Sequence, residues 1–163
     1  MNHRNNVRRL ILALLGVGFI AGSAQASAPP GRYTVQSATV VDNQTALTWQ
    51  QNVSITGGAD GTGRVSWAGA LTYCSNLNLN GTGWRLPTIK ELATIIDFTT
   101  VYPSIDTVAF PNTPYDPIDQ QTYPFWSSTQ VVGLNGSYVS DFGYGYIATP
   151  SGVANLSFVR CVR

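Results

Sequence analysis

The chain has 163 residues, of which 44% are hydrophobic and 10% charged, and its formal net charge is +1. That length favours one domain with a hydrophobic core of its own. The near-neutral charge argues against proteins that bind nucleic acids or anionic membrane surfaces, because both depend on dense positive charge.

The first 26 residues have the pattern of a signal peptide. Three arginines within residues 4–9 precede an apolar run over residues 10–20, and Ala24-Gln25-Ala26 gives the small-x-small pattern at which signal peptidase cuts. Cleavage after Ala28 is less favoured, because Pro29 would follow the cut bond. The run is too short to span a membrane, which takes about 20 residues. We therefore expect cleavage after Ala26, a secreted or periplasmic mature domain over residues 27–163, and no membrane insertion.

Cleavage changes the chemistry that the chain can offer. The only histidine and the only methionine leave with the signal, and the six basic and eight acidic residues that remain give a net charge of −2. Without histidine, a nucleophile at Ser127 or Ser128 has no general base, and the only lysine, Lys90, lies at a helix start. The acids are scattered through loops and form no rigid pair for glycoside hydrolysis. We predict no enzymatic activity and no cofactor.

The first elements in chain order are β-rich. Residues 33–41 predict a strand, residues 42–45 supply turn chemistry, and residues 47–49 return as the second strand of a hairpin. A glycine-rich loop follows over residues 56–63. Ser66 can then cap a helix. The apolar face predicted for that helix consists of Trp67, Ala70, Leu71, Cys74 and Leu77.

A turn over residues 80–83 leads to a second helix, which begins with a capping box formed by Thr88 and Glu91. Its predicted buried stripe consists of Ile89, Leu92, Ala93 and Ile96. Residues 98–124 hold five prolines and no sustained periodicity, which indicates a functional loop or a packed cover over the core.

Short strands resume at residues 125–128, 137–142 and 144–148, and residues 158–162 form the last one. Early helices followed by short antiparallel strands predict an α+β fold. We expect two helices flanking one small, mostly antiparallel sheet, with a long irregular loop.

Cys74 and Cys161 are the only cysteines, and in an exported protein an even, minimal count indicates one disulfide. The competing interpretation is a reactive cysteine. No histidine remains to activate one, and Arg160 is the only cation next to a thiol in the sequence. We expect the disulfide, which would close a loop of about 88 residues.

Several motifs along the mature chain resemble one family, and their order and spacing make the match specific. They are Val41-Asp42-Asn43-Gln44-Thr45 with Leu47-Thr48-Trp49, Ser66-Trp67-Ala68 with Ala70-Leu71 and Tyr73-Cys74, Trp84-Arg85-Leu86-Pro87-Thr88 with Glu91-Leu92, Phe110-Pro111-Asn112-Thr113, Trp126-Ser127-Ser128-Thr129, and Arg160-Cys161-Val162-Arg163. Over residues 36–163 the chain resembles the Lcl C-terminal domain family. More distantly, it is similar to the sulfatase-modifying (formylglycine-generating) domains. Those domains have a C-type-lectin-like fold, so the resemblance implies that fold here.

The resemblance implies a function only in part. The collagen-like bacterial adhesin that names the family implies binding to sulfated polysaccharides, but this chain has no Gly-x-y repeat. The formylglycine-generating enzymes use a dedicated cysteine pair, whereas both cysteines here match structural positions. The Glu-Pro-Asn and Trp-Asn-Asp segments of calcium-dependent lectins do not occur. The resemblance therefore implies a binding domain that has neither the cysteine chemistry of those enzymes nor the calcium site of those lectins.

Aromatic residues in and beside the long loop are the main candidates for a ligand site. Sugar faces and apolar peptide side chains pack on such rings while the polar tips stay hydrated. The alternative is that some of the rings only cover the core. The candidate ligand-binding residues are Tyr102, Tyr115, Tyr123, Trp126 and Tyr144.

Asp106, Asp116 and Asp119 could supply oxygen ligands to calcium. They lack the spacing of a calcium-binding loop, and aspartates form turns equally well, so we predict no metal site. Arg85 and Glu91 are expected to serve the tight loop and the capping box.

The sequence thus predicts an exported, non-catalytic binding module for an extracellular glycan or a surface partner. A sulfated ligand would require basic residues to gather, namely Arg160 and Arg163 with Arg64, Arg85 or Lys90. The alternative is a structural or assembly subunit of the cell envelope that binds another protein through the long loop. A hydrolase is less favoured.

Overall fold

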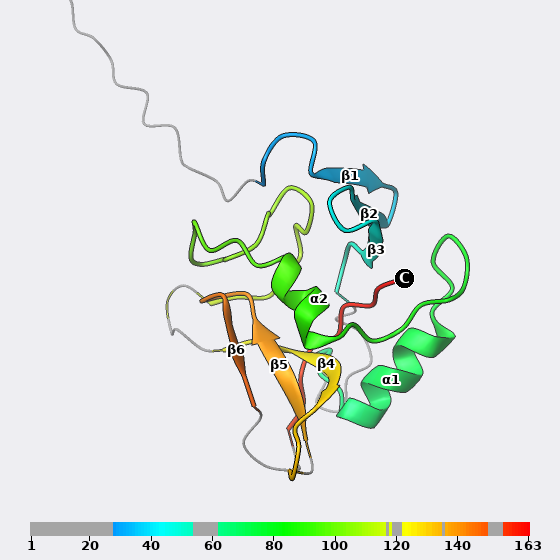
Figure 1. The fold of residues 1–163 in the computed structure, drawn as a ribbon, viewed down its shortest axis with the longest axis vertical. Helices are drawn as coiled ribbons and strands as arrows, with labels where there is room; N and C mark the ends of the chain where they lie inside the picture. The colour runs from blue at the N-terminus through cyan, green and yellow to red at the C-terminus, as the bar shows by residue number, and fades with distance from the viewer. Residues whose placement is uncertain (1–27, 54–61, 117, 119–121, 135, 150–154) are drawn as a thin grey trace, which may run out of the picture.

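The computed structural model describes residues 28–53, 62–116, 118, 122–134, 136–149 and 155–163 (Figure 1). The predicted signal peptide lies outside these residues, as does most of the glycine-rich loop predicted over residues 56–63. The described chain forms two helices and two small antiparallel sheets of three strands each. The α+β prediction is confirmed, but the prediction of a single sheet is wrong.

The first sheet consists of β1 (Tyr33–Gln36), β2 (Thr39–Asp42) and β3 (Leu47–Gln50), in that spatial order. The predicted strand over residues 33–41 is therefore two strands. The chain reverses after Gln36, where Ser37 has a φ of +50°, and Gln36 then pairs with Thr39. A serine in the left-handed region leaves no strong sequence signal, so β-propensity alone missed this turn.

The second sheet consists of β4 (Pro124–Gln130), β5 (Ser137–Asp141) and β6 (Tyr146–Ala148), also in chain order. The register places Val139 opposite Ala148 and Asp141 opposite Tyr146. Because side chains alternate between the faces of a sheet, these four residues share one face. The predicted strands after the long loop are confirmed, with shifted ends.

The helices are α1 (Trp67–Asn76) and α2 (Ile89–Thr94). Ser66 caps α1, where its hydroxyl accepts a bond from the Gly69 amide, and Thr88 and Glu91 complete the predicted capping box of α2. Figure 1 shows α2 between the two sheets, and it packs against β4 and β5. Within the described ranges, neither helix is long and apolar enough to cross a membrane.

The C-terminal segment is not a strand of either sheet, although a last strand was predicted there. Val162 forms single antiparallel bridges with Trp49 and with Arg85, and Phe158 bridges in parallel to Phe125. The segment changes partner every few residues, so no continuous ladder can form. It ties the first sheet to β4, so the N-terminal sheet and the chain end lie close together.

Two apolar clusters form the core. The first lies between the sheets and α2; it contains Val40, Trp49, Val53, Leu92, Ile95, Ile96, Ile105, Ala109, Phe110, Phe125, Phe142, Phe158 and Val162. The second joins α1 to β4 and β5; it contains Ala70, Cys74, Trp84, Leu86, Trp126, Val139, Val159 and Cys161.

The predicted disulfide is confirmed. It joins Cys74 of α1 to Cys161 with an S–S distance of 2.02 Å, and both residues are fully buried. It therefore fastens α1 to the C-terminal segment in the middle of the second cluster.

The long loop packs on the first cluster, since Ile105 and Phe110 are fully buried. Other apolar residues of the loop point outward: Phe98, Val101 and Val108 are between 64% and 77% exposed. The loop is therefore both a cover for the core and a surface.

Candidate functional site

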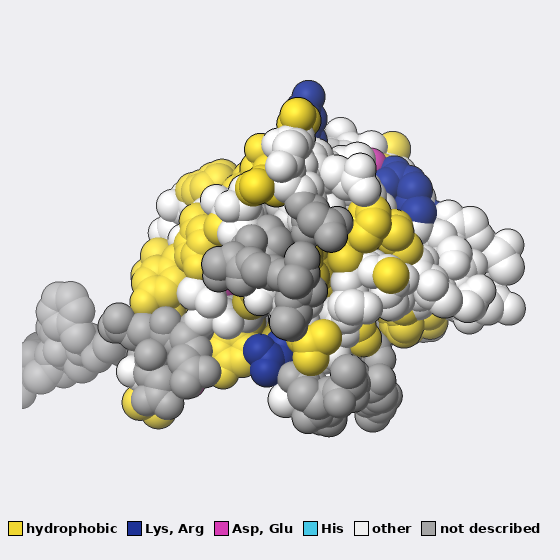
Figure 2. Space-filling model, turned by 90° about the horizontal axis from the view of Figure 1, so that it is seen from below, with side chains coloured by type: hydrophobic (Ala, Val, Ile, Leu, Met, Phe, Trp, Pro, Cys, Tyr) yellow, Lys and Arg dark blue, Asp and Glu magenta, His cyan; other side chains and the backbone are white. Residues whose placement is uncertain are grey.

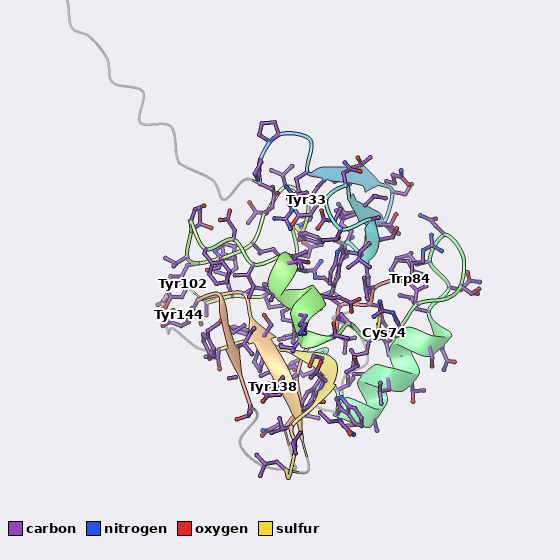
Figure 3. The ribbon with its side chains drawn as sticks, in the orientation of Figure 1. Tyr33, Cys74, Trp84, Tyr102, Tyr138 and Tyr144 are labelled. Carbon is purple, nitrogen blue, oxygen red and sulfur yellow. A yellow bond between two sulfur atoms is a disulfide. The ribbon has the colours of Figure 1, made fainter. Side chains whose placement is uncertain are left out.

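Three tyrosine rings meet at one end of the second sheet. The ring centroids of Tyr102 and Tyr144 lie 4.6 Å apart at 65°, and those of Tyr144 and Tyr146 lie 6.3 Å apart at 42°. Figure 3 shows Tyr102 and Tyr144 side by side at the edge of the molecule. Tyr144 and Tyr146 are 38% and 39% exposed. We call Tyr102, Tyr144 and Tyr146 the tyrosine surface.

Backbone hydrogen bonds hold the long loop against the turn between β5 and β6. The Tyr102 amide donates to the Gly143 carbonyl at 2.9 Å, and the Ser104 amide donates to the Phe142 carbonyl at 2.6 Å. Gly145 in this turn has a φ of +72°, and a Cβ there would come within 2.9 Å of the Ser104 Cβ. Only glycine fits, so the close approach that joins the rings depends on it.

Asp141 fixes the same turn from beneath. Its carboxylate accepts bonds from the Tyr144 amide at 2.9 Å and from the Tyr123 amide at 2.7 Å, and the residue is 1% exposed. The rings therefore stand on a backbone that is tied at several points, which limits the entropy that a ligand would have to remove.

The hydroxyls of Tyr102 and Tyr146 stay protonated at neutral pH. Burial, with the neighbouring Tyr144 hydroxyl, raises the pKa of Tyr102 to about 12. Burial and the Asp141 carboxylate likewise raise the pKa of Tyr146. Hydroxyl groups both donate and accept hydrogen bonds. The Tyr102 hydroxyl is buried, so the exposed Tyr144 and Tyr146 combine apolar ring faces with polar tips.

The structure brings some of the predicted residues together and separates others. Tyr115 is 39% exposed and lies beside the turn, because a Cβ on Gly143 would be 3.9 Å from its Cβ. Tyr123 packs on Phe158 with ring centroids 6.0 Å apart and is partly buried against the first cluster. It belongs mainly to the core.

Trp126 is 4% exposed and lies in the second cluster, where its indole N–H donates to the Val65 carbonyl at 2.7 Å. Its ring is therefore a core element and does not join the tyrosine surface. Tyr146, in contrast, was not among the predicted site residues. Its position two residues after Tyr144, across a glycine, was the available signal.

The acidic loop residues that could have bound calcium serve the backbone instead. Asp106 accepts bonds from the amides of Ala28, Val108 and Ala109. Asp116 accepts a bond from the Ile118 amide at 2.8 Å, and Asp119 lies outside the described residues. Among the residues that the structure describes, no three His, Cys, Asp or Glu side chains lie together as a metal site would need.

Arg160 cannot join the group of basic residues that a sulfated ligand would require, because its side chain is fully buried. Its guanidinium donates to the Gln50 and Gln51 carbonyls at 3.0 and 2.5 Å and to the Thr113 hydroxyl at 2.7 Å. It also lies 4.5 Å from the centroid of the Phe110 ring. Burial lowers the pKa of Arg160 to about 9, so the group remains charged at neutral pH.

Two of the other basic residues that a sulfated ligand would need have partners of their own. Arg85 makes two bonds to Glu91, at 2.8 and 2.6 Å, and the guanidinium of Arg163 lies 4.9 Å from the Trp84 ring centroid. Figure 2 shows basic side chains at separate points on the face it presents. On the face that Figure 2 presents, the basic side chains therefore form no patch that would attract a polyanion.

Comparison with curated proteins and with solved structures finds no match. A family model does match, over residues 38–163, and its description is the Lcl C-terminal domain. The matched region contains β2, β3, both helices, the second sheet and the tyrosine surface. The β1 strand lies before it. This chain belongs to the Lcl C-terminal domain family.

Proposed function

We propose that this domain is an exported, non-catalytic binding module of C-type-lectin-like fold that recognises an extracellular glycan through the tyrosine surface. The observation that carries the proposal is the contact of the Tyr102 ring with the exposed rings of Tyr144 and Tyr146 at one edge of the molecule. The buried disulfide supports export, because disulfides persist in oxidising compartments.

The chemistry of the surface suits a sugar. The C–H faces of sugar rings pack on aromatic rings, while sugar hydroxyls need hydrogen-bond partners, and tyrosine offers both. Since the backbone of the loop and of the β5–β6 turn is already tied together, binding would order few groups.

The serines that could have acted as nucleophiles support a non-catalytic function. The Ser127 hydroxyl donates to the Tyr138 carbonyl at 2.6 Å, and the Ser128 hydroxyl donates to the Pro87 carbonyl at 3.2 Å. Each hydroxyl therefore donates its hydrogen to a backbone carbonyl. Neither hydroxyl has a general base among its hydrogen-bond partners.

A neutral glycan fits better than a sulfated one. The predicted mature charge is −2, Arg160 is buried, and Arg85 is neutralised by Glu91. A sulfated chain would meet no concentration of positive charge on the described surface.

A second candidate is a structural or assembly subunit of the cell envelope. The exposed side chains of Phe98, Val101 and Val108 favour it, because apolar residues on one loop can anchor a partner protein. In that case the long loop, and not the tyrosine surface, would carry the contact.

A glycan array separates the two candidates. It is run at two salt concentrations, with and without calcium, on the wild type and on Tyr144→Ala. We expect binding to neutral glycans that salt and calcium leave unchanged, and a weakening of about tenfold in Tyr144→Ala, which corresponds to about 1.4 kcal/mol.

Tyr138→Ala is the matched control, because Figure 3 shows Tyr138 well away from Tyr102 and Tyr144. It should bind as the wild type does. Absence of glycan binding, together with a protein partner crosslinked through the loop around Phe98, would favour the assembly subunit. Salt-sensitive binding to sulfated glycans would contradict the neutral ligand.

A further inference from the structure

A cavity of about 520 Å³ adjoins the tyrosine surface. Its floor is the face of the second sheet that carries Val139, Asp141, Tyr146 and Ala148, as the register requires. The volume lies within the range of about 300–1,000 Å³ that small-molecule sites occupy. We call this cavity the sheet pocket.

Another part of the lining comes from the C-terminal segment beside β4 and from the residues that pair with it. Val65 and Ser157 pair there through two backbone bonds of 3.0 Å each, and both Arg64 and Ser157 line the cavity. The sheet and this backbone bridge hold part of the lining in place before a ligand arrives.

Tyr146 belongs to both features. It lines the pocket, and its ring lies 6.3 Å from that of Tyr144. A chain of sugar rings lying on Tyr102 and Tyr144 would therefore reach the pocket at Tyr146 without crossing unrelated surface.

The polar groups of the pocket suit a ligand rich in hydroxyls. The Ser157 side chain is 1% exposed, and its hydroxyl has no hydrogen-bond partner within the described part of the chain. A buried hydroxyl without a partner is costly, and a polar ligand would relieve that cost. Each oxygen of Asp141 accepts one backbone amide and keeps acceptor capacity for a ligand hydroxyl.

The charges of the pocket oppose a strongly ionic ligand. One guanidinium, Arg64, and one carboxylate, Asp141, line it together with the hydroxyls of Thr122 and Tyr146. A carboxylated or sulfated sugar would meet the Asp141 carboxylate, and a cationic one would meet Arg64. An apolar ligand would leave these polar groups without partners.

We propose that the sheet pocket is a binding subsite for one neutral, hydroxyl-rich sugar ring of the glycan that lies along the tyrosine surface. This inference rests on the proposed function. It adds a second place of contact, which gives the tyrosine surface a preference for neutral sugars.

The test uses methyl glycosides of glucose, galactose and mannose, with methyl glucuronide as the anionic counterpart, in saturation-transfer NMR on the intact mature chain. Ala148→Leu adds bulk on the pocket floor, and Ile147→Phe adds bulk to an exposed side chain on the opposite face of β6. We expect at least one neutral glycoside to bind the wild type and Ile147→Phe, with an affinity about tenfold lower in Ala148→Leu.

Ser157→Ala is a second variant, which tests the pocket even if Ala148→Leu fails to fold. Because its hydroxyl is buried and unpartnered in the described chain, removing it should leave the melting temperature unchanged or higher. It should weaken glycoside binding several-fold. A lower melting temperature with unchanged binding would assign Ser157 to the fold and overturn its part in the subsite.

The outcomes distinguish this inference from the proposed function. Loss of oligosaccharide binding in Tyr144→Ala, with no effect of Ala148→Leu on any sugar, would refute the pocket and keep the tyrosine surface. Glycoside binding that Ala148→Leu removes and Tyr144→Ala leaves intact would keep the pocket and refute the tyrosine surface. Preference for methyl glucuronide would refute the neutral ligand, and no binding of any sugar would refute both.

Discussion

Removal of the disulfide is the perturbation whose effect can be calculated most directly. Cys74 and Cys161 are separated by 87 positions, and their bond joins α1 to the segment that ties the first sheet to β4. Replacing both by alanine removes the crosslink without burying a new polar group. A serine pair would confound the result, because both sites are fully buried.

The expected loss follows from the length of the closed loop. In the chain-entropy account, a loop of about 88 residues restricts the unfolded chain by about 4–5 kcal/mol at 25 °C. The two lost sulfur atoms add a smaller packing cost. Domains of this size are stable by about 5–15 kcal/mol. The double variant should therefore be close to unfolding at 37 °C.

Urea unfolding of the oxidised protein, the reduced protein and the Cys74→Ala/Cys161→Ala variant measures this loss. Reduction keeps both sulfur atoms, so the difference between the reduced protein and the variant isolates the packing cost. The m-value should rise without the crosslink, because a freer unfolded chain exposes more surface. Equal midpoints for the oxidised and reduced proteins would refute the entropic argument. Alkylation of either cysteine without reductant would refute the bond itself.

Two further predictions concern charged groups. Arg160→Lys keeps the charge but loses the planar guanidinium that reaches three acceptors. Urea unfolding should therefore show a free energy of unfolding that is lower by about 2–4 kcal/mol. Arg163→Lys, at the surface, is the control and should change it little. The hydrogen bond from Arg85 lowers the pKa of Glu91 from 4.5 to about 2. This pair therefore stabilises the fold above about pH 4.5, and the contribution is lost as the pH falls towards 2. Because the Arg85 side chain is 48% exposed, we expect the pair to contribute about 1 kcal/mol or less to the free energy of unfolding. Glu91→Gln should remove this part of the dependence of stability on pH, as measured by thermal unfolding.

Features decided by neighbouring residues could be predicted from the sequence. The caps at Ser66 and Thr88 depend on side chains within one turn of each helix, and both formed as expected. The disulfide was also predictable, since two cysteines leave only one intramolecular pairing. The described residues of the predicted loop before Pro124 contain no helix or strand, and they cover the core with Ile105 and Phe110.

Features decided by distant contacts could not be predicted. Arginine is rarely fully buried, and the sequence does not show that the carbonyls of Gln50 and Gln51 and the hydroxyl of Thr113 would surround Arg160. The division into two sheets also depends on long-range contacts, because the C-terminal segment bridges to both and completes neither.

The candidate site shows the same limit. Aromatic residues around the long loop were the right class, but composition could not tell an exposed ring from a buried one. Register decides it: Trp126 pairs with Val139 and enters the second cluster, whereas Tyr146 pairs with Asp141 at the open end of the sheet. Tyr102 joins the surface only because its amide binds the Gly143 carbonyl.

The site and the disulfide stabilise different parts of the molecule, and this bears on how binding and stability are related. The tyrosine surface is held by the bonds of Tyr102 and Ser104 to the β5–β6 turn, and none of them involves the residues around Cys74 or Cys161. The crosslink acts mainly on the unfolded chain. A reduced molecule that is still folded should therefore keep its affinity for a glycan. Reduction would lower the folded fraction and not the intrinsic binding constant, so loss of binding in the reduced protein should follow its unfolding curve.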